Sequence, residues 1–311
     1  MSKMHIWLDT DCGVDDALAI LFALKQEEFD VVGMSSVAGN VTHEFTFKNT
    51  RNVVHLANRD DVKVYPGAIQ PLIKPLHTAG EVHGNDGLGG VVIEESPNPK
   101  ETKKAWDAMY EASLQYDDLR IVAVGPLTNV ATALILHEDM KDHVKEILFM
   151  GGAIEYGNVT PSAEFNIFAD PHAAKIVIES GIPNVMCGLD VTLNNILLPD
   201  DVKELNYENK ACALIQDSST VVMNLYEKLV GRRQLVMHDT TPLMYLVHPE
   251  MFVGKKCGVK VETRGQLTMG KTVCDMHTDH KFDEQNVFAL YGSDRALFKK
   301  YVFETLRSYS K

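Results

Sequence analysis

Basic residues are scarce in this chain. Its 311 residues include 30 Lys and Arg but 43 Asp and Glu, which gives a formal net charge of −13. Nucleic-acid-binding proteins usually carry a basic excess or a basic stripe, so this balance argues against nucleic acid as a partner. The sequence also lacks any run of about 18 apolar residues, the length that a membrane-spanning helix needs. No apolar signal core precedes the first acidic residues, so we expect neither a membrane anchor nor a secretory leader.

Cysteine is also sparse. The chain has five cysteines, an odd number without CxxC spacing, at positions 12, 187, 212, 257 and 274. This set fits neither a disulfide framework nor a zinc site, and it favours a reducing, cytoplasmic location. Hydrophobic residues make up 45% of the chain, which excludes a disordered protein. Internal repeats, low-complexity tracts and linkers are absent, so we expect one domain spanning residues 1–311.

Short apolar runs alternate with helical patterns along the first two thirds of the sequence. This alternation predicts an α/β fold, a mostly parallel open sheet with helices on both faces. The expected strands are 5–8, 29–36, 62–65, 119–124, 146–150 and 184–187, and the expected helices are 15–25, 42–57, 127–136 and 171–180. A mainly helical region at 199–229, a strand pair within 258–273 and a final helix at 293–308 complete the prediction. Ligands bind such sheets beyond the carboxyl ends of the strands, so we expect the active site there.

The densest chemistry follows the first expected strand, in the segment DTDCGVDD at residues 9–16. Four carboxylates so close together repel one another and raise one another's pKa, which makes them costly without a cation. Ca²⁺ and Mg²⁺ take carboxylate oxygens, and Gly13 allows a tight turn. Asp15 and Asp16 also suit a helix N-terminus. The alternative is that two of these residues only cap the helix while the others are solvated.

Three further regions of the sequence carry polar motifs of interest. Residues 122–129 (VAVGPLTN) end a strand in Gly-Pro, which frees a backbone carbonyl, although most such turns only connect elements. Residues 149–152 (FMGG) permit a close backbone approach, and 158–166 (NVTPSAEFN) supply polar groups for hydroxyls; a polar loop is the alternative. Residues 238–242 (HDTTP) offer a fifth carboxylate and a titratable histidine, or a capping Asp beside a surface His.

The remaining candidates carry weaker signals. His83 lies in a Gly-rich loop that could close over a site, and a solvated loop histidine is the alternative. Tyr226 and Arg233 follow a helical pattern and could line a pocket, although packing is the favoured interpretation for both. Cys12 has no histidine partner nearby in the sequence, so we read it as an inert small residue.

Together these motifs resemble the nucleoside hydrolase family, the inosine-uridine preferring ribonucleoside N-ribohydrolases. The opening segment is similar to the family's DxDxGxDD signature, and VAGN, HGNDGLGG, VGPLTN, MGG, NxTPxAEFN and HDTTP appear in the family's order. The resemblance covers nearly the whole chain. Cys12 departs from the proline of many members, which alters the turn without supplying a ligand.

The resemblance implies a set of site residues and a cofactor. Ca²⁺ would be bound by the side chains of Asp11, Asp16 and Asp239 and by the main-chain carbonyl of Val124, with waters completing its coordination. Asp11 would also be the general base for one of those waters. The ribose would be held by Asp15, Asn40, Met150, Asn158, Glu164, Asn166 and Asp239, while His83 would belong to a loop closing over the site. His238 would lie on the side of the leaving base, where it could act as proton donor or electrostatic stabiliser.

The implied function is Ca²⁺-dependent hydrolysis of the N-glycosidic bond of ribonucleosides, giving free base and ribose, in nucleoside salvage. Family members are commonly dimers or tetramers, so we expect a homodimer or homotetramer, and the sequence leaves the base preference open. Two alternatives keep the same fold: an inactive nucleoside- or ribose-binding protein, and a hydrolase of a modified nucleoside or nucleotide. A third is an aspartate-nucleophile phosphatase, because Asp9 and Asp11 have the spacing of its DxD motif. That scheme leaves the AEFN and HD segments unexplained.

Overall fold

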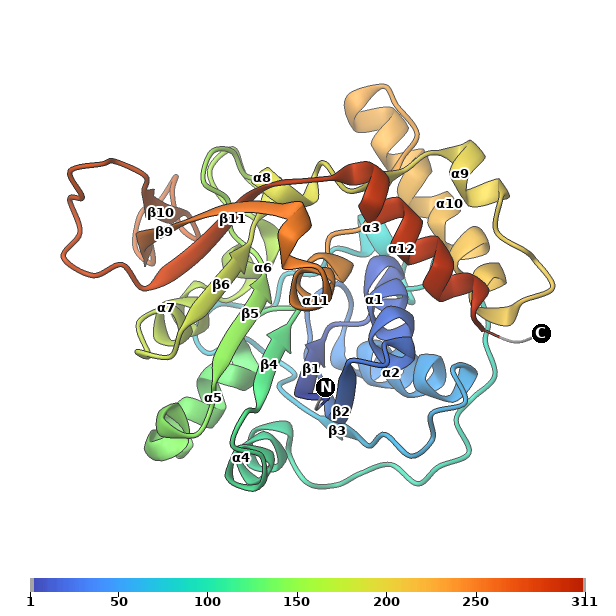
Figure 1. Ribbon diagram of the computed structural model, residues 1–311, viewed down its shortest axis with the longest axis horizontal. Helices are drawn as coiled ribbons and strands as arrows, with labels where there is room; N and C mark the ends of the chain where they lie inside the picture. The colour runs from blue at the N-terminus through green and yellow to red at the C-terminus, as the bar shows by residue number, and fades with distance from the viewer. Residues whose placement is uncertain (1–2, 310–311) are drawn as a thin grey trace.

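One large sheet organises the molecule. The computed structural model describes residues 3–309; Met1, Ser2, Ser310 and Lys311, which the predicted domain includes, lie outside the described residues. The sheet has nine strands (Figure 1). In spatial order these are β10 (Thr272–Asp275), β9 (Phe252–Val261), β11 (Val287–Ser293), β6 (Asn184–Cys187), β5 (Glu146–Met150), β4 (Arg120–Ala123), β1 (Met4–Thr10), β2 (Phe29–Ser36) and β3 (Val64–Pro66).

The sheet is parallel from β3 to β11, and only β9 and β10 run antiparallel to their neighbours. This confirms the predicted mostly parallel α/β fold. Strand β1 shows why both faces must be covered. Ile6 and Leu8 belong to one hydrophobic core, whereas Trp7 between them belongs to the core on the opposite face. Successive side chains of a strand point to opposite faces, so a strand buried on both sides reads as a continuous apolar run.

Helices cover both faces (Figure 1). On one side lies α1 (Val14–Lys25). It packs against the other helices of that face, which are α2 (His43–Leu56), α10 (Lys210–Val230), α11 (Thr240–Val247) and α12 (Arg295–Arg307). On the other side lie α4 (Ala105–Gln115), α5 (Thr128–Leu136) and α7 (Pro171–Ile178). The short elements are α3 (Gly80–His83), α6 (Phe165–Ala169), α8 (Leu189–Thr192), α9 (Pro199–Lys203), a small β7 (Ile196–Leu197) and β8 (Leu235–Val236) pair, and two 3₁₀ turns at Glu138–Asp142 and Pro249–Met251.

Most predicted elements are present, and the differences concentrate in the last third of the chain. The region 199–229 is two helices, α9 and α10, and the antiparallel pair is β9 with β10. Strand β11 was not predicted, and it takes the first residue of the expected final helix. Helices α4 and α11 were also missed. The proline at position 242 lies in the first turn of α11, where a backbone N–H needs no partner within the helix, so the helix tolerates it.

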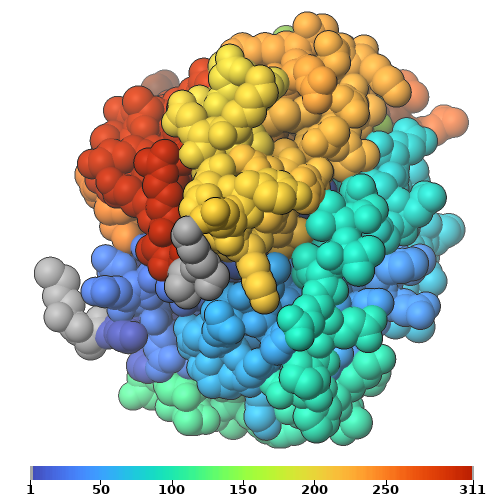
Figure 2. Space-filling model, turned by 90° about the vertical axis from the view of Figure 1, so that its right-hand side faces the viewer, coloured from blue at the N-terminus to red at the C-terminus, as the bar shows by residue number. Residues whose placement is uncertain are grey.

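A long irregular segment crosses one face of the molecule. Residues 67–104 contain a single helix, α3, and Figure 2 shows the segment lying over α2 and alongside the α9–α10 region. Ion pairs join it to both neighbours, from Glu95 to Lys48 of α2 and from Glu94 to Lys210 of α10. Between residues 3 and 309, no helix has both the length and the apolar character to cross a membrane.

Candidate functional site

A cavity of about 470 Å³ opens beyond the carboxyl ends of the parallel strands. Ten of the twelve residues singled out by the sequence line it: Asp15, Asn40, His83, Val124, Met150, Asn158, Glu164, Asn166, His238 and Asp239. The other two, Asp11 and Asp16, adjoin these lining residues. The carboxylate oxygens of Asp15, Asp16 and Asp239 lie within 4.8 Å of one another, and Asp11 is bonded to Asn40. We call Asp11, Asp15, Asp16 and Asp239 the acidic cluster.

The acidic cluster is held by hydrogen bonds from its own loop and from Asn40. One carboxylate oxygen of Asp16 accepts from the Thr10 hydroxyl at 2.6 Å, and the other accepts from the Gly13 N–H at 2.8 Å and from Asn40 Nδ2 at 2.9 Å. Asp11 Oδ2 accepts from the Asn40 N–H at 2.7 Å. Asp11 Oδ1 is buried and has no hydrogen-bond partner among the described residues. This buried oxygen of Asp11 is therefore free to contact a ligand.

Burial makes this concentration of charge costly. It raises the pKa of Asp15 to about 7, with a further contribution from the charge of Asp16. The pKa values of Asp11 and Asp239 are also raised well above the usual range, chiefly by burial and then by the neighbouring carboxylates. Four buried acids that share one space repel one another when ionised, and a bound cation would relieve that repulsion. Oxygen ligands of this kind suit a hard divalent cation.

Gly13 serves packing rather than the turn that the sequence predicted. Its backbone is in an ordinary extended conformation, with φ −99° and ψ −159°. A Cβ atom there would lie 2.5 Å from His83 Nδ1 and 2.8 Å from Asn40 Nδ2. The Val14 N–H donates to the same His83 nitrogen at 3.1 Å. The missing side chain thus lets His83 reach the start of α1, and burial lowers the pKa of this histidine to about 4.

A second group of polar residues joins the ends of β4 and β5. Glu164 accepts hydrogen bonds from the N–H groups of Gly152 and Asn166, both at 2.9 Å, and burial raises its pKa to about 7. Asn166 Nδ2 donates to the carbonyl of Val124 at 2.8 Å and to that of Met150 at 3.1 Å. These bonds fix the two strand ends relative to each other and direct polar groups into the cavity.

The opposite end of the cavity is more apolar. Helix α10 contributes Val222, Leu225, Tyr226 and Leu229, which we call the apolar wall. His238 lies beside it, with Nε2 at 3.3 Å from the Tyr226 hydroxyl and Nδ1 at 2.8 Å from the Thr192 hydroxyl. Burial, with a smaller effect of His83, lowers the pKa of His238 to about 3. The imidazole is therefore neutral at pH 7.

Of the two candidates that the sequence offers in this region, the structure places one at the cavity, and it adds Val222, Leu225 and Leu229, which the sequence does not single out. Tyr226 packs against the core, as expected, but it also lines the cavity and contacts His238. Arg233 is exposed and is not among the lining residues. The spacing of the wall residues along α10 marks one helical face. That face turns to the cavity because of packing between α10 and two distant elements, α1 and α3.

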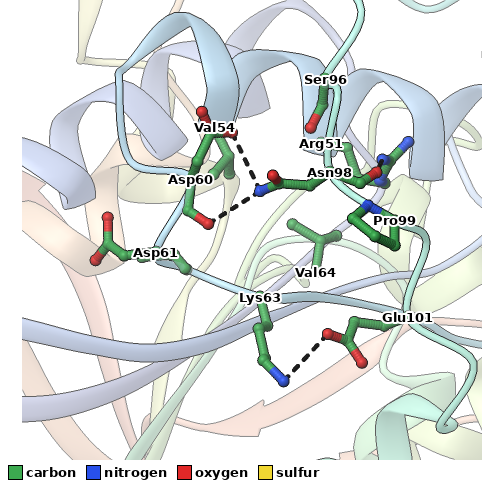
Figure 3. A pocket seen from close by; sticks show the side chains of 11 residues that line it. Arg51, Val54, Asp60, Asp61, Lys63, Val64, Ser96, Asn98, Pro99 and Glu101 are labelled. Carbon is green, nitrogen blue, oxygen red and sulfur yellow. Dashed lines mark hydrogen bonds and ion pairs between the residues drawn. The ribbon is translucent and has the colours of Figure 1, made fainter.

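A second cavity, of about 250 Å³, lies between the end of α2 and the 94–101 segment (Figure 3). Its polar groups pair with one another. Asn98 Nδ2 donates to the Asp60 carbonyl at 3.0 Å, and Lys63 forms an ion pair with Glu101 at 3.2 Å. None of the twelve candidate residues lines it. These contacts fasten the irregular segment to the body of the domain.

Known proteins resemble the chain over almost its full length. The family model described as inosine-uridine preferring nucleoside hydrolase matches residues 6–300. The non-specific ribonucleoside hydrolase RihC of Salmonella typhimurium is 38% identical over 276 residues, which are 88% of this chain and 89% of that protein. The pyrimidine-specific ribonucleoside hydrolase RihA of Photobacterium profundum is 35% identical over 98% of this chain and 99% of its own. The solved structure of a purine-preferring ribonucleoside hydrolase from Gardnerella vaginalis has a TM-score of 0.91 and 31% identity, over 97% and 98% of the two chains.

Proposed function

The chain belongs to the inosine-uridine preferring nucleoside hydrolase family and is a ribonucleoside hydrolase, which acts on N-glycosyl bonds, and from this premise we propose how its site works. The acidic cluster binds Ca²⁺, and water cleaves the N-glycosidic bond of an uncharged ribonucleoside to give free base and ribose. The observation that carries the proposal is the buried set of carboxylates in the main cavity, one of whose oxygens has no partner. No Lys or Arg is among the residues that line the cavity, which favours a substrate without phosphate.

The donor set fits a hard cation. Asp11, Asp16 and Asp239 would hold the ion through carboxylates, and Val124 would hold it through its carbonyl, which has a second lone pair beside the one that accepts from Asn166. Asp15 lies close enough to Asp16 and Asp239 to share the same charge environment. When bound, the ion lowers the pKa of a water and fixes its position.

Asp11 is the proposed general base. Its Oδ1 has no hydrogen-bond partner, while Oδ2 is fixed by the Asn40 N–H, so the carboxylate is oriented and has one oxygen free. Asp11 takes the proton from the water that attacks the anomeric carbon on the face opposite the base. No covalent intermediate forms, so the configuration at that carbon inverts.

The ribose hydroxyls are proposed to lie against Asp15, Asn40, Met150, Asn158, Glu164, Asn166 and Asp239, all of which line the cavity. Each hydroxyl bonded to a carboxylate contributes roughly 1.5–3 kcal/mol. Bonds that tighten as the sugar ring flattens contribute to the rate as well as to binding. A substrate without the 2′-hydroxyl leaves buried acceptors unpaired, and we expect it to react ~10⁴-fold less efficiently.

His238 is proposed to stabilise the departing base. Because burial keeps the imidazole neutral, it acts as a hydrogen-bond donor to the developing negative charge rather than as a stored imidazolium. The hydroxyls of Thr192 and Tyr226 contact its two ring nitrogens and hold the ring in the cavity. His83, on α3, also lines the cavity and would close over the substrate.

The test is incubation of the Ca²⁺-loaded protein with inosine, adenosine, uridine and cytidine, with ribose and free base separated by chromatography. We expect equal amounts of base and ribose without added phosphate, and the ranking of the four substrates gives the base preference. Binding of all four without release of base would favour the inactive binding protein. Neither binding nor release, with the metal bound, would favour a modified nucleoside.

We also propose a cytoplasmic location and assembly as a homodimer or homotetramer. All five cysteines are free thiols, as expected for a protein kept in a reducing compartment. Light scattering coupled to size-exclusion chromatography measures the assembly state directly, and a monomer of 34.6 kDa would refute the assembly.

A further inference from the structure

We propose that Lys271 and Asp190 are positioning residues that together hold segment 153–158 in the conformation that presents Asn158 to the ribose. The proposal rests on the ribonucleoside site described above. It concerns two charged side chains outside the cavity lining, one just before β10 and one on α8, which form hydrogen bonds to the same stretch of backbone.

Lys271 and Asp190 form hydrogen bonds with the backbone carbonyl and N–H groups of the segment. The Lys271 ammonium donates to the carbonyl oxygens of Ala153, Ile154 and Glu155, at 3.1, 3.0 and 2.5 Å. The Asp190 carboxylate accepts from the N–H groups of Ile154 at 2.6 Å and Glu155 at 3.2 Å. Hydrogen bonds to ionised groups are stronger than neutral ones. Three carbonyls and two N–H groups of consecutive residues are thus satisfied by opposite charges.

Thr272 holds the start of the same segment, next to the cavity. The Thr272 hydroxyl accepts from the Ala153 N–H at 2.9 Å and donates to the Ala153 carbonyl at 2.8 Å. Gly152, just before Ala153, donates to Glu164 in the cavity. At the far end of the segment Asn158 N–H donates to the Ala163 carbonyl at 3.1 Å, and Asn158 Oδ1 accepts from the Phe165 N–H at 3.0 Å. The segment between these two anchors is held by the charges.

Apolar burial contributes little to the middle of this segment. Glu155 is exposed and Tyr156 is 77% exposed, so neither side chain anchors the backbone in the core. A loop with few buried contacts opens at a small free-energy cost unless hydrogen bonds hold it. The bonds of Asn158 to Ala163 and Phe165 fix one end of the segment, and the charges of Lys271 and Asp190 fix the other, so both are needed to present Asn158 before the substrate arrives.

This arrangement predicts a particular kinetic signature. If the segment is disordered in the free protein, the free-energy cost of ordering it weakens the binding of the substrate and of the transition state by the same amount. Uniform loss of this kind raises KM and leaves kcat nearly unchanged. For Lys271→Met we expect KM for ribonucleosides to rise by ~10-fold while kcat changes by less than ~3-fold. Lys271→Arg keeps donors for the carbonyls and should recover most of the loss.

The structure offers a matched control. Lys255 on β9 is also half-buried, but its ammonium donates to a single carbonyl, that of Met276 at 3.0 Å. Lys255→Met removes the same charge from the neighbouring strand β9 without touching segment 153–158, so its KM should stay at the wild-type value. Asp190→Asn keeps one acceptor oxygen and should raise KM by less than Lys271→Met.

The experiment combines steady-state kinetics with hydrogen–deuterium exchange of the ligand-free protein. We expect faster exchange confined to residues 153–158 in Lys271→Met and Asp190→Asn, and not in Lys255→Met. Unchanged exchange, unchanged KM, or acceleration spread over the whole domain would each overturn the proposal. If Lys271→Met does not fold, Asp190→Asn decides by the same criteria. If wild-type protein releases no base, the proposed function fails while exchange still tests the hydrogen bonds of Lys271 and Asp190 to the backbone.

Discussion

The acidic cluster and the apolar wall face each other across the main cavity, and the chain builds them differently. Three of the four clustered carboxylates are close together in the sequence, Asp11 in the loop after β1 and Asp15 and Asp16 in the first turn of α1, and all four are buried. The apolar wall comes from a 21-residue helix that is exposed toward its end, where Leu229 is 68% exposed. The acidic cluster, which we propose activates water, is fixed within the core, whereas the apolar wall, which we propose meets the base, reaches the surface at Leu229. Substitutions in the two regions should therefore have different consequences.

The largest effect should come from Asp11→Asn, which removes the proposed base while keeping its size and its acceptor for the Asn40 N–H. We expect kcat to fall by ~10³- to 10⁴-fold on purine and pyrimidine ribonucleosides alike, because the acidic cluster is common to all substrates. Base release measured by chromatography checks this, with Ca²⁺ binding as the control for an intact cluster. A loss restricted to one class of base would break the division between cluster and wall.

His238→Ala should act through the leaving group. We expect inosine cleavage to slow by ~10²-fold, whereas a p-nitrophenyl riboside, whose leaving group needs no hydrogen bond, slows by less than ~10-fold. Tyr226→Phe removes only the hydroxyl near His238 Nε2 and should give a smaller change in the same direction. Equal losses on both substrates would show that His238 does not serve the leaving base.

The free energy of unfolding should depend on pH through the buried carboxyls of the site. Burial raises the pKa of Asp15 from 3.8, and that of Glu164 from 4.5, to about 7. Between about pH 4 and pH 7 these two carboxyls bind more protons in the folded protein than in the unfolded chain, so their contribution to the free energy of unfolding falls as pH rises. The lowered pKa values of His83 and His238 act in the opposite direction below about pH 6.5, and the raised pKa values of Asp11 and Asp239 add to the fall. With chelator present, we expect Tm to be several degrees lower at about pH 8 than at about pH 5.

Added Ca²⁺ should reverse this trend, because the ion binds the ionised cluster of the folded protein. Differential scanning fluorimetry at the two pH values, with chelator and with excess Ca²⁺, gives the four Tm values needed. A chelated protein that is more stable at the higher pH would contradict the assignment of raised pKa values to these carboxyls.

The smallest effect should come from Leu229→Ala in the apolar wall. A fully buried methylene in a specificity pocket is worth ~10-fold or more in discrimination, and an exposed side chain less, so we expect the ratio of kcat/KM between inosine and uridine to change by ~3-fold. The neighbouring Val230 is 60% exposed and lies outside the cavity lining, so Val230→Ala is the matched control. A change in the p-nitrophenyl riboside rate with Leu229→Ala would place this residue with the catalytic groups instead.

The two regions also differ in how far the sequence predicts them. The acidic cluster is readable because Asp11, Asp15 and Asp16 are close along the chain, where a strand ends and a helix begins. Asp239 joins them because HDTTP follows the short β8 strand, and that motif signalled a site without revealing α11. The wall could not be placed, since the orientation of Tyr226 depends on contacts of α10 with elements far away in sequence.

Long-range packing also explains why the sequence predicts neither the contacts of Lys271 and Asp190 with segment 153–158 nor strand β11. Lys271 and Asp190 have no spacing that marks a site, and they meet only because β10 and α8 both approach the end of β5. Strand β11 has a mixed burial pattern, which gives no clear strand periodicity. Its pairing with β6 is a contact between residues about a hundred positions apart. Local chemistry was predictable, and the long-range packing that orients it was not.

The position of β11 has a consequence for biosynthesis. This strand is made after β9 and β10, yet it pairs with β6 on one side and with β9 on the other. Until the ribosome has released Val287–Ser293, the emerging polypeptide holds an uncovered edge on β6 and a hairpin with no sheet to join. Such edges recruit other chains, and pairing across long sequence separations is slow. Translation that stops before Val287 should therefore yield aggregates rather than a smaller working enzyme, and the cell's chaperones should meet this protein during its last moments of synthesis.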